Sequence, residues 1–294
     1  MKNKEQETRN RKQGTRYPFS FLLSAFCFLL SPVFANETLD KDKEIVETFI
    51  HSDERNNCAK CCMTEAALYL LDTPYVAATL EGNKEERLVV NLRELDCTTF
   101  VENCLAMTLS LTNDSLPSFE SFTNYLKEIR YRGGIINGYP SRLHYFTDWI
   151  IDNTFFELVE DITYDLGGKP FTPNVYYMST NPDKYPALKG RPDYIASIKQ
   201  AEKRINANDS LFYIPNKHID IVAEDIRDGD IVAFVTSTSG LDVQHLGIAF
   251  WDNRHLTFIH ASSRAKKVII NPESLADYCT KQKNIIGIMV LRTK

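Results

Sequence analysis

The sequence predicts an α+β fold in which a largely buried helix packs on a small antiparallel sheet. Apolar residues recur at helical spacing over residues 97–111, which indicates a helix buried on most of its surface. After Ile226 the pattern changes to short apolar runs bounded by turn residues, at 231–235, 243–251, 255–261, 267–270 and 285–291. Strands that follow a helical region at such close spacing are typical of an antiparallel sheet in an α+β layout. The 294 residues, 43% of them hydrophobic, are enough for one large domain or two small ones.

The first 35 residues have the pattern of a secretory signal peptide. Residues 2–16 are basic, residues 19–30 are apolar, and Val33-Phe34-Ala35 fits the small-residue rule for cleavage before Asn36. The apolar run is too short to cross a bilayer comfortably. We therefore expect export across the inner membrane, a periplasmic location and no stable membrane anchor.

The net charge argues against nucleic acid as a partner. The formal charge of the whole chain is −5, and removing residues 1–35, which hold six basic and two acidic residues, leaves −9. An acidic chain without a basic stripe is a poor candidate for binding phosphate backbones.

The cysteines leave two alternatives open. Exported proteins can form disulfides, and Cys58, Cys61 and Cys62 form a cluster that could be bridged to Cys279 or could simply pack inside helices, as is expected for Cys104. A zinc site needs a second pair of ligands at the right spacing, and none follows the cluster. We therefore expect no metal ion and no other cofactor.

Two helices, over residues 38–51 and 57–71, are expected before the central helix. They form an N-terminal helical extension over residues 36–72, and the main domain then covers residues 73–294.

Cys97 lies at the start of the central helix, directly after Asp96, which is a good N-cap residue. The first turn of a helix has unpaired N–H groups and the positive end of the helix dipole, and both stabilise a thiolate. Cysteines in such positions can have a pKa of roughly 3.5–7.5. The alternative is a small buried hydrophobic residue.

His245 and His260 lie on two consecutive predicted strands. A hairpin with Asp252-Asn253 as its two-residue turn makes these histidines direct cross-strand neighbours. Gly247 and Ala249 share the face of His245, and their small size is expected to leave room for the Cys97 helix. A cysteine, a histidine and a second polar residue beside the histidine are the nucleophile, base and orienting group of a catalytic triad.

These residues resemble the NlpC-type cell-wall cysteine peptidases, a papain-like superfamily, and within it the N-acetylmuramoyl-L-alanine amidase-like branch. The resemblance runs from about Thr73 to the C-terminus. It rests on five segments: 95–102 (Leu-Asp-Cys-Thr-Thr-Phe-Val-Glu), 141–145 (Ser-Arg-Leu-His-Tyr), 148–150 (Asp-Trp-Ile), 240–245 (Gly-Leu-Asp-Val-Gln-His) and 260–263 (His-Ala-Ser-Ser).

The resemblance implies a papain-like core and an amide hydrolase. Cys97 would be the nucleophile, His245 the base and His260 the orienting residue. The substrate would be a muropeptide, cut between N-acetylmuramic acid and L-alanine. Three alternatives stay open: cleavage of the D-glutamyl–diamino-acid bond of the stem peptide, a non-catalytic module that binds muropeptides or glycans, and acyl transfer on lipid.

Residues 142–152 are expected to form a helix with one polar and aromatic face. This face holds Arg142, Tyr145, Asp148 and Trp149 and is expected to line the substrate groove, with Arg142 for a carboxylate or carbonyl and Tyr145 and Trp149 for stacking. The alternative is a half-buried helix with an internal pair between Arg142 and Asp148. Tyr75 follows Pro74 in a pair that the resemblance places near the groove. Residues 113–222 are expected to form an insertion between Cys97 and His245 that narrows the groove.

Overall fold

The computed structural model describes residues 32–52, 62–253 and 255–294. Most of the predicted signal peptide, and also Cys58 and Cys61, lie outside the described residues. No helix in the described part of the chain is long and apolar enough to span a bilayer.

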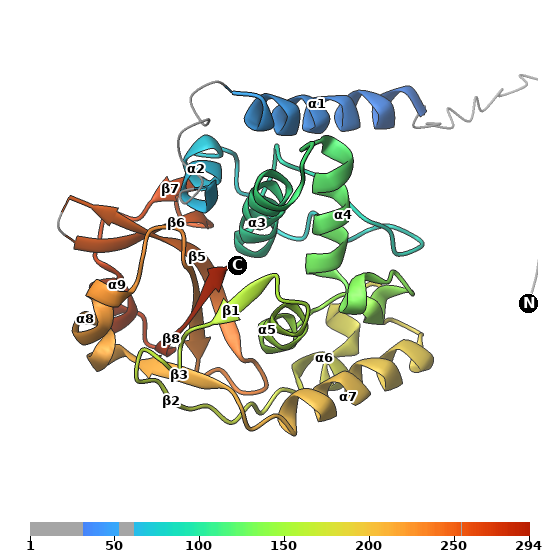
Figure 1. Cartoon of the computed structure of the whole chain (residues 1–294). Helices are drawn as coiled ribbons and strands as arrows, with labels where there is room; N and C mark the ends of the chain where they lie inside the picture. Colours follow the sequence, from blue (N-terminus) through green and yellow to red (C-terminus); the bar gives the residue numbers. More distant parts are fainter. Residues whose placement is uncertain (1–31, 53–61, 254) are drawn as a thin grey trace, which may run out of the picture.

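An eight-stranded antiparallel sheet forms the centre of the molecule (Figure 1). Its strands follow the order β2-β3-β8-β4-β5-β6-β7, and β1 pairs with another part of β8. The strands predicted from the sequence are confirmed as β4 (Ile231–Thr236), β5 (Val243–Asp252), β6 (His255–Ser262), β7 (Lys267–Ile270) and β8 (Ile285–Thr293).

The other three strands come from the predicted insertion. They are β1 (Val159–Asp161), β2 (Lys169–Pro170) and β3 (Phe212–Pro215). Strands of two to four residues carry too few side chains for a recognisable alternation. The range 113–222 therefore contributes three short strands to the sheet.

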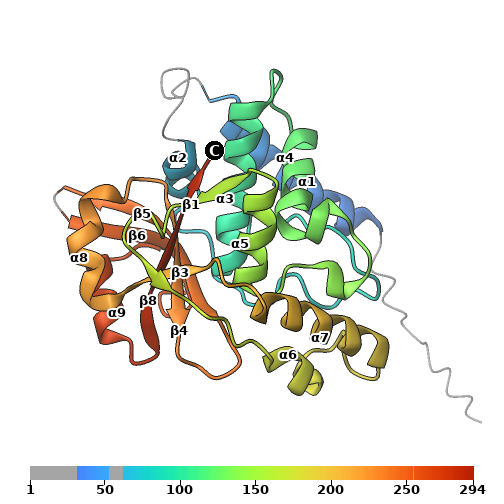
Figure 2. The same cartoon turned by 60° about the horizontal axis from the view of Figure 1, so that its bottom comes forward.

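Helices cover both faces of the sheet (Figures 1 and 2). On one face lies the central helix α3 (Cys97–Asn113), flanked by α2 (Cys62–Tyr69), α4 (Phe119–Arg130) and α5 (Phe146–Phe155), with α1 (Pro32–Ile50) outermost. On the other lie α8 (Ile219–Val222) and α9 (Leu275–Lys281). Of the remaining helices, α7 (Pro192–Asn206) packs beside α5, and α6 (Tyr177–Thr180) packs beside α7. The layout is the predicted α+β arrangement.

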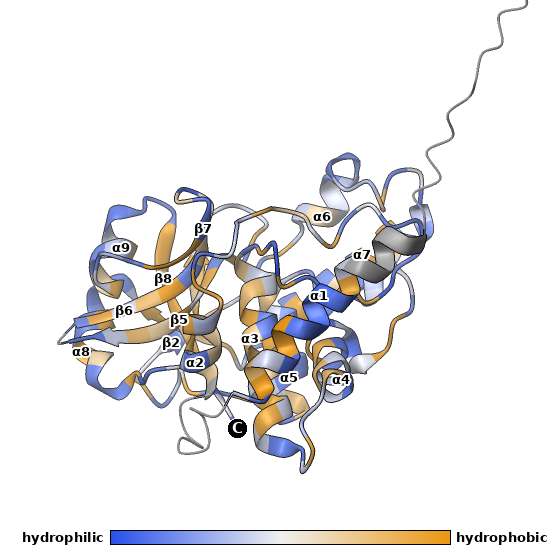
Figure 3. Cartoon of the chain, turned by 90° about the horizontal axis from the view of Figure 1, so that it is seen from above, coloured by the Kyte–Doolittle hydropathy of each residue, from blue (hydrophilic) through white to orange (hydrophobic). Residues whose placement is uncertain are grey.

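Alternation along the strands divides the core into two layers. In β5, Leu246 and Ile248 face α3, whereas Ala249 faces α9. The α3 side is the larger layer because α3 is buried over nearly its whole length, from Thr99 to Ser110. Figure 3 shows this helix in predominantly apolar colours. Because α3 is buried in this way, it is a rigid support for the residues at its N-terminus.

Candidate active site

Cys97 is the first residue of α3, as predicted. Asp96 caps the helix: its carboxylate accepts a hydrogen bond from the Thr99 N–H at 2.8 Å, and the Asp96 N–H donates to the Thr99 hydroxyl at 2.9 Å. This capping box fixes the first turn. The Cys97 thiol also has a backbone hydrogen bond with Leu246, the residue after His245. The start of α3 is thereby tied to β5 next to the histidine.

The acidity of Cys97 differs from the prediction. Burial is the main cause that raises the pKa of Cys97 to about 11, and the negative charge of Asp96 adds to it. Hydrogen bonds from Leu246 and Thr98 lower this pKa, but by less. A carboxylate that caps a helix stabilises the helix but disfavours a second negative charge one residue away. The thiol is therefore protonated at neutral pH, and a nucleophilic role requires a base.

The hairpin register is shifted by two residues from the prediction. Ile248 pairs with Ile259 and Asp252 with His255, so the turn lies one residue later than Asp252-Asn253. His245 and His260 are consequently diagonal neighbours and not a direct pair. An even shift keeps both side chains on the same face, and diagonal neighbours remain within reach of ring side chains.

That face is opposite to the one that packs on α3. His245 contacts Phe234, and His260 contacts Phe258 and Tyr278, all in or against the α9-side core. The expected role of Gly247 is wrong as well: a Cβ there would lie 2.6 Å from the Phe258 ring, so the glycine makes room for Phe258 and not for the Cys97 helix.

A β-bulge precedes His245. Phe234 pairs with His245, but Val235 pairs with Val243, which leaves Gln244 as the extra residue of β5. A bulge bends a strand and changes the direction of neighbouring side chains. Here it brings the beginning of β5 to the N-terminus of α3.

The two histidines form a hydrogen-bonded pair. Nε2 of His245 lies 2.6 Å from Nδ1 of His260, with the rings at 85°. This leaves Nδ1 of His245 as the ring nitrogen available to another group. Burial lowers the pKa of His245 to about 4, and burial together with the neighbouring imidazole lowers that of His260 to about 3. Both rings are neutral at pH 7.

Cys97 and His245 line one cavity of about 240 Å³. Thr98 lies at its Cys97 side, and most of its wall comes from residues 139–146 and 241–246. Glu81, Met178 and Tyr185 complete the lining. The structure therefore brings together Cys97, His245 and His260, as the sequence predicted, from α3, β5 and β6. Among the described residues, no group of three or more His, Cys, Asp or Glu side chains is arranged to hold a metal ion.

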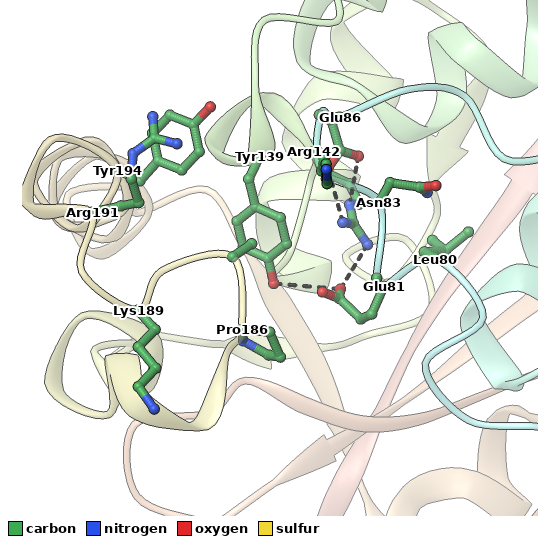
Figure 4. Close-up of a pocket in the computed structure, with 13 residues that line it drawn as sticks. Leu80, Glu81, Asn83, Glu86, Tyr139, Arg142, Pro186, Lys189, Arg191 and Tyr194 are labelled. Carbon is green, nitrogen blue, oxygen red and sulfur yellow. Dashed lines mark hydrogen bonds and ion pairs between the residues drawn. The ribbon is translucent and has the colours of Figure 1, made fainter. Parts of the chain in front are cut away.

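Arg142 is not free to bind a substrate carboxylate. Its guanidinium lies 3.0 Å from Glu81 Oε1 and 3.1 Å from Glu86 Oε2, and the residue is only 7% exposed (Figure 4). It also lies outside α5, which begins at Phe146, so the expected helix over 142–152 is wrong in its first turn. Arg142 instead fixes the segment around residues 81–86 to the wall of the cavity.

Two other predicted groove residues, Trp149 and Asp148, are buried in the structure. Trp149 is 1% exposed and stacks on Phe146, so its predicted stacking role is wrong because no ring face is open to a ligand. Asp148 is buried and pairs with Arg132 and Arg204, so the alternative pair with Arg142 is also wrong.

Tyr145 lines the cavity, but its hydroxyl is occupied. It donates to Glu202 at 2.9 Å and accepts from the Met178 N–H at 2.9 Å. Tyr75 is half-buried near Cys97: burial, and after it the charges of Cys97 and Asp96, raise the pKa of its phenol. Tyr75 is not among the residues that line the cavity.

No role was predicted for Asp242, although it belongs to the 240–245 segment. It is 3% exposed and lines the cavity. Its Oδ2 accepts from the Thr147 N–H and hydroxyl at 2.7 and 2.8 Å, and its Oδ1 accepts from the Val243 N–H at 2.8 Å. Asp242 thus caps α5 and holds the start of β5. The sequence signal for this role is that Asp242 lies three residues before His245, the candidate base.

Cys279 is a free thiol buried on the α9 side. Cys58 and Cys61, with which a disulfide was considered, lie outside the described residues. Cys104 is also free and buried in α3, as expected. Of Cys62, only its place in α2 is described.

The chain is similar to several solved structures. A crystal structure of an N-acetylmuramoyl-L-alanine amidase from Bacteroides uniformis is 38% identical, covering 79% of this chain and 97% of its own, with a TM-score of 0.73. A Bacteroides fragilis protein whose structure carries the name of a candidate xylanase is 39% identical, covering 78% and 99%, also with a TM-score of 0.73. A Legionella pneumophila protein, 21% identical over 90% of this chain and 96% of its own, shares the fold with a TM-score of 0.65.

No curated protein matches the chain. The model of the N-acetylmuramoyl-L-alanine amidase-like family matches residues 65–288, which contain all three members of the candidate triad. The chain belongs to the N-acetylmuramoyl-L-alanine amidase-like family.

Proposed function

We propose that this protein is a cysteine-dependent amidase of the NlpC type that cuts the bond between the lactyl group of N-acetylmuramic acid and L-alanine in muropeptides. The observation that carries the proposal is that His245 lines one cavity with Cys97 and forms a 2.6 Å hydrogen bond with His260. It supplies a nucleophile, a base with one ring nitrogen free, and a group that orients the base. The family and the amidase from Bacteroides uniformis support the choice of substrate.

The first half of the reaction forms a thioester. Nδ1 of His245 accepts the proton of the Cys97 thiol while Sγ attacks the carbonyl carbon of the scissile amide. The imidazolium that forms donates from Nε2 to Nδ1 of His260, which stabilises its charge. The backbone N–H of Cys97 lies in the first turn of α3, where N–H groups lack helical acceptors, and it would stabilise the oxyanion.

Cleavage of the C–N bond completes the first half: the imidazolium gives its proton to the nitrogen of L-alanine, the thioester is left on Cys97, and the free peptide leaves. The second half returns the enzyme to its resting state. Water then gives a proton to His245 and its oxygen attacks the thioester carbonyl. When the C–S bond breaks, Sγ takes that proton back, and the products are a muramoyl carboxylate and an L-alanyl peptide.

Because burial holds the pKa of His245 at about 4 and that of Cys97 at about 11, the resting pair is neutral and not an ion pair. The thiol proton therefore moves only when substrate is attacked. In this site His245 acts as a true general base.

The cavity does not favour a xylanase. A glycosidase of the common type uses two carboxyl groups facing the scissile bond. The two carboxyl groups that line the cavity are both engaged: Asp242 by Thr147 and Val243, and Glu81 by Arg142.

Mass spectrometry of purified muropeptides incubated with the protein tests the proposal. We expect release of the sugar and an intact L-alanyl peptide, loss of this release in Cys97→Ala, and its retention in Cys104→Ala, which removes a thiol from the same helix outside the cavity. A fragment ending in D-glutamate would move the cut to the stem-peptide bond. Equal turnover by wild type and Cys97→Ala would end the cysteine mechanism.

A further inference from the structure

A second hollow adjoins the catalytic cavity. It has a volume of about 340 Å³ and shares Glu81 and Tyr139 with that cavity (Figure 4). We call it the distal pocket; its other charged lining residues are Lys84, Glu86, Arg142, Lys189 and Arg191. An intermediate hollow of about 410 Å³, which extends from Asp96 and Thr98 to Pro186, borders both. A ligand that reacts at Cys97 can therefore extend into the distal pocket.

The carboxylates of the distal pocket are turned inward. Both Glu81 and Glu86 accept hydrogen bonds from Arg142, at 3.0 and 3.1 Å. Glu86 also accepts from the Tyr131 hydroxyl at 2.8 Å, and Glu81 from the Tyr139 hydroxyl at 3.4 Å. The single guanidinium of Arg142 offsets one of the two negative charges, and the side chain of Glu86 is only 8% exposed.

The cations differ from the carboxylates in this respect. Lys84 and Lys189 are exposed, and neither ammonium group has an ion pair or a hydrogen bond with any described residue. Arg191 is held by Asp193 at 2.9 Å. In a chain with a net charge of −5, two unpaired lysines at the end of a groove select for negative charge in a ligand.

The aromatic rings of the distal pocket are already covered. The Arg191 guanidinium lies 3.7 Å from the centre of the Tyr194 ring, and that of Arg142 lies 4.8 Å from the centre of the Tyr139 ring. Cation–π contacts of this kind occupy the ring faces on which a sugar would stack. The pocket is thus suited to an anionic group and not to the uncharged glycan side of a muramoyl amide.

We infer that the distal pocket is an anion subsite in which Lys84 and Lys189 bind a carboxylate of the peptide part of the substrate. The inference rests on the proposed function, because that function makes the ligand a muramoyl peptide. An L-alanyl-D-glutamyl-diamino-acid peptide offers two such groups, the free carboxylate of glutamate and the C-terminal carboxylate. Lysine–carboxylate contacts at an exposed site are weak singly, so the subsite acts on affinity and leaves the chemical step unchanged.

Calorimetry with the Cys97→Ala protein tests this binding separately from catalysis. Three synthetic tripeptides are compared: the free acid, its C-terminal amide, and the amide of the glutamate carboxylate. We expect one of the two amides to bind roughly five- to twentyfold more weakly than the free acid, and this amide identifies the carboxylate. Lys84→Gln combined with Lys189→Gln should weaken the free acid by the same factor and abolish the discrimination. Lys199→Gln, at an exposed lysine of α7 outside the pocket, is the matched control.

The outcomes separate the two proposals. Three outcomes would overturn the subsite, even if wild type releases L-alanyl peptides from muropeptides. They are equal binding of all three peptides, an equal loss of affinity for acid and amide in the double variant, and no binding of any peptide. Discrimination that depends on the two lysines, without that release, would support the subsite and reject the proposed bond.

Discussion

Nε2 of His245 lies 2.6 Å from Nδ1 of His260, and the two rings meet nearly at a right angle. His260 is 4% exposed, and its Nε2 has no hydrogen-bond partner among the described residues. A neutral His260 that accepts at Nδ1 carries its own proton on Nε2, toward Phe258 and Tyr278. The orienting group is thus an uncharged acceptor, which can align His245 without raising its pKa as a carboxylate would.

This relationship predicts different effects for two substitutions of His260. His260→Ala leaves Nε2–H of His245 buried without an acceptor, which costs about 1–3 kcal/mol, and kcat/KM should fall about 10- to 100-fold. His260→Asn restores an acceptor and should recover most of the loss. Steady-state rates on one muropeptide, with melting temperatures as a folding control, measure the effect. Equal losses in both variants would assign His260 a packing role.

The alkylation rate of Cys97 should rise steadily with pH. Because burial and Asp96 raise its pKa to about 11, little thiolate is present at pH 7. We expect slow labelling by iodoacetamide at pH 7 and about tenfold faster labelling for each pH unit up to about pH 10. Asp96→Asn removes a negative charge and should increase the rate at a given pH. Peptide mass spectrometry localises the label, and a rate that is flat between pH 6 and 9 would show a preformed thiolate.

Arg142 should contribute substantially to the free energy of unfolding through its ion pairs with Glu81 and Glu86. Arg142→Leu leaves Glu81 and Glu86 near each other without a counter-charge, and breaking such a buried pair costs about 3–5 kcal/mol. Adding Glu81→Gln and Glu86→Gln to Arg142→Leu should recover part of this loss. Urea unfolding measures both, with Arg191→Leu as an exposed control expected to cost under about 1 kcal/mol. A loss for Arg142→Leu no larger than for Arg191→Leu would contradict the anchoring role.

Asp242→Asn should lower activity through the position of His245. The asparagine amide cannot accept all the hydrogen bonds that Oδ1 and Oδ2 receive from Thr147 and Val243. We expect a destabilisation of about 1–3 kcal/mol and a fall in kcat larger than in Thr147→Val, which removes only the hydroxyl donor. Equal kcat values in the two variants, at matched stability, would limit Asp242 to capping α5.

The parts of the fold that the sequence could predict are those with strong local signals. The start of α3 follows from Asp96 and the helical spacing after it, and the strands from β4 to β8 follow from apolar runs between turns. The short strands β1 and β2 could not be found this way, because their pairing depends on β8 and β3, far away in the sequence. Long-range pairing decides such segments, and local propensity does not.

The candidate triad was predictable in identity but not in detail. A good turn signal at Asp252-Asn253 gave a register two residues away from the observed one, because packing along β5 and β6 outweighs the preference of one turn. Trp149 and Asp148 were misplaced for a similar reason: spacing shows which residues share a helix face but not whether that face is covered by another helix. The carboxylate of Asp96 also acts twice, as a cap and as a charge beside Cys97, and a motif alone does not show which effect is larger.

Acid should destabilise the protein through its buried imidazoles. The pKa of His144 is lowered to about 3 by burial and Arg142, and those of His245 and His260 are lowered to about 4 and about 3. An unfolded histidine titrates near pH 6.5, so between pH 6.5 and 4 the unfolded chain binds more protons than the folded one. Stability is therefore fully present above pH 6.5 and falls as the pH drops, by up to about 1.4 kcal/mol per pH unit for each imidazole.

His144→Gln isolates one of these contributions outside the triad. Nε2 of His144 donates to the Tyr139 carbonyl at 2.9 Å, and a glutamine amide can replace this donor without titrating. We expect the fall in melting temperature between pH 7 and 4.5 to be smaller in His144→Gln by about a third, whatever the absolute stability of the variant at pH 7. An unchanged fall would mean that His144 is already accessible to protons in the folded protein, and that the acid sensitivity comes from the triad histidines or from other groups.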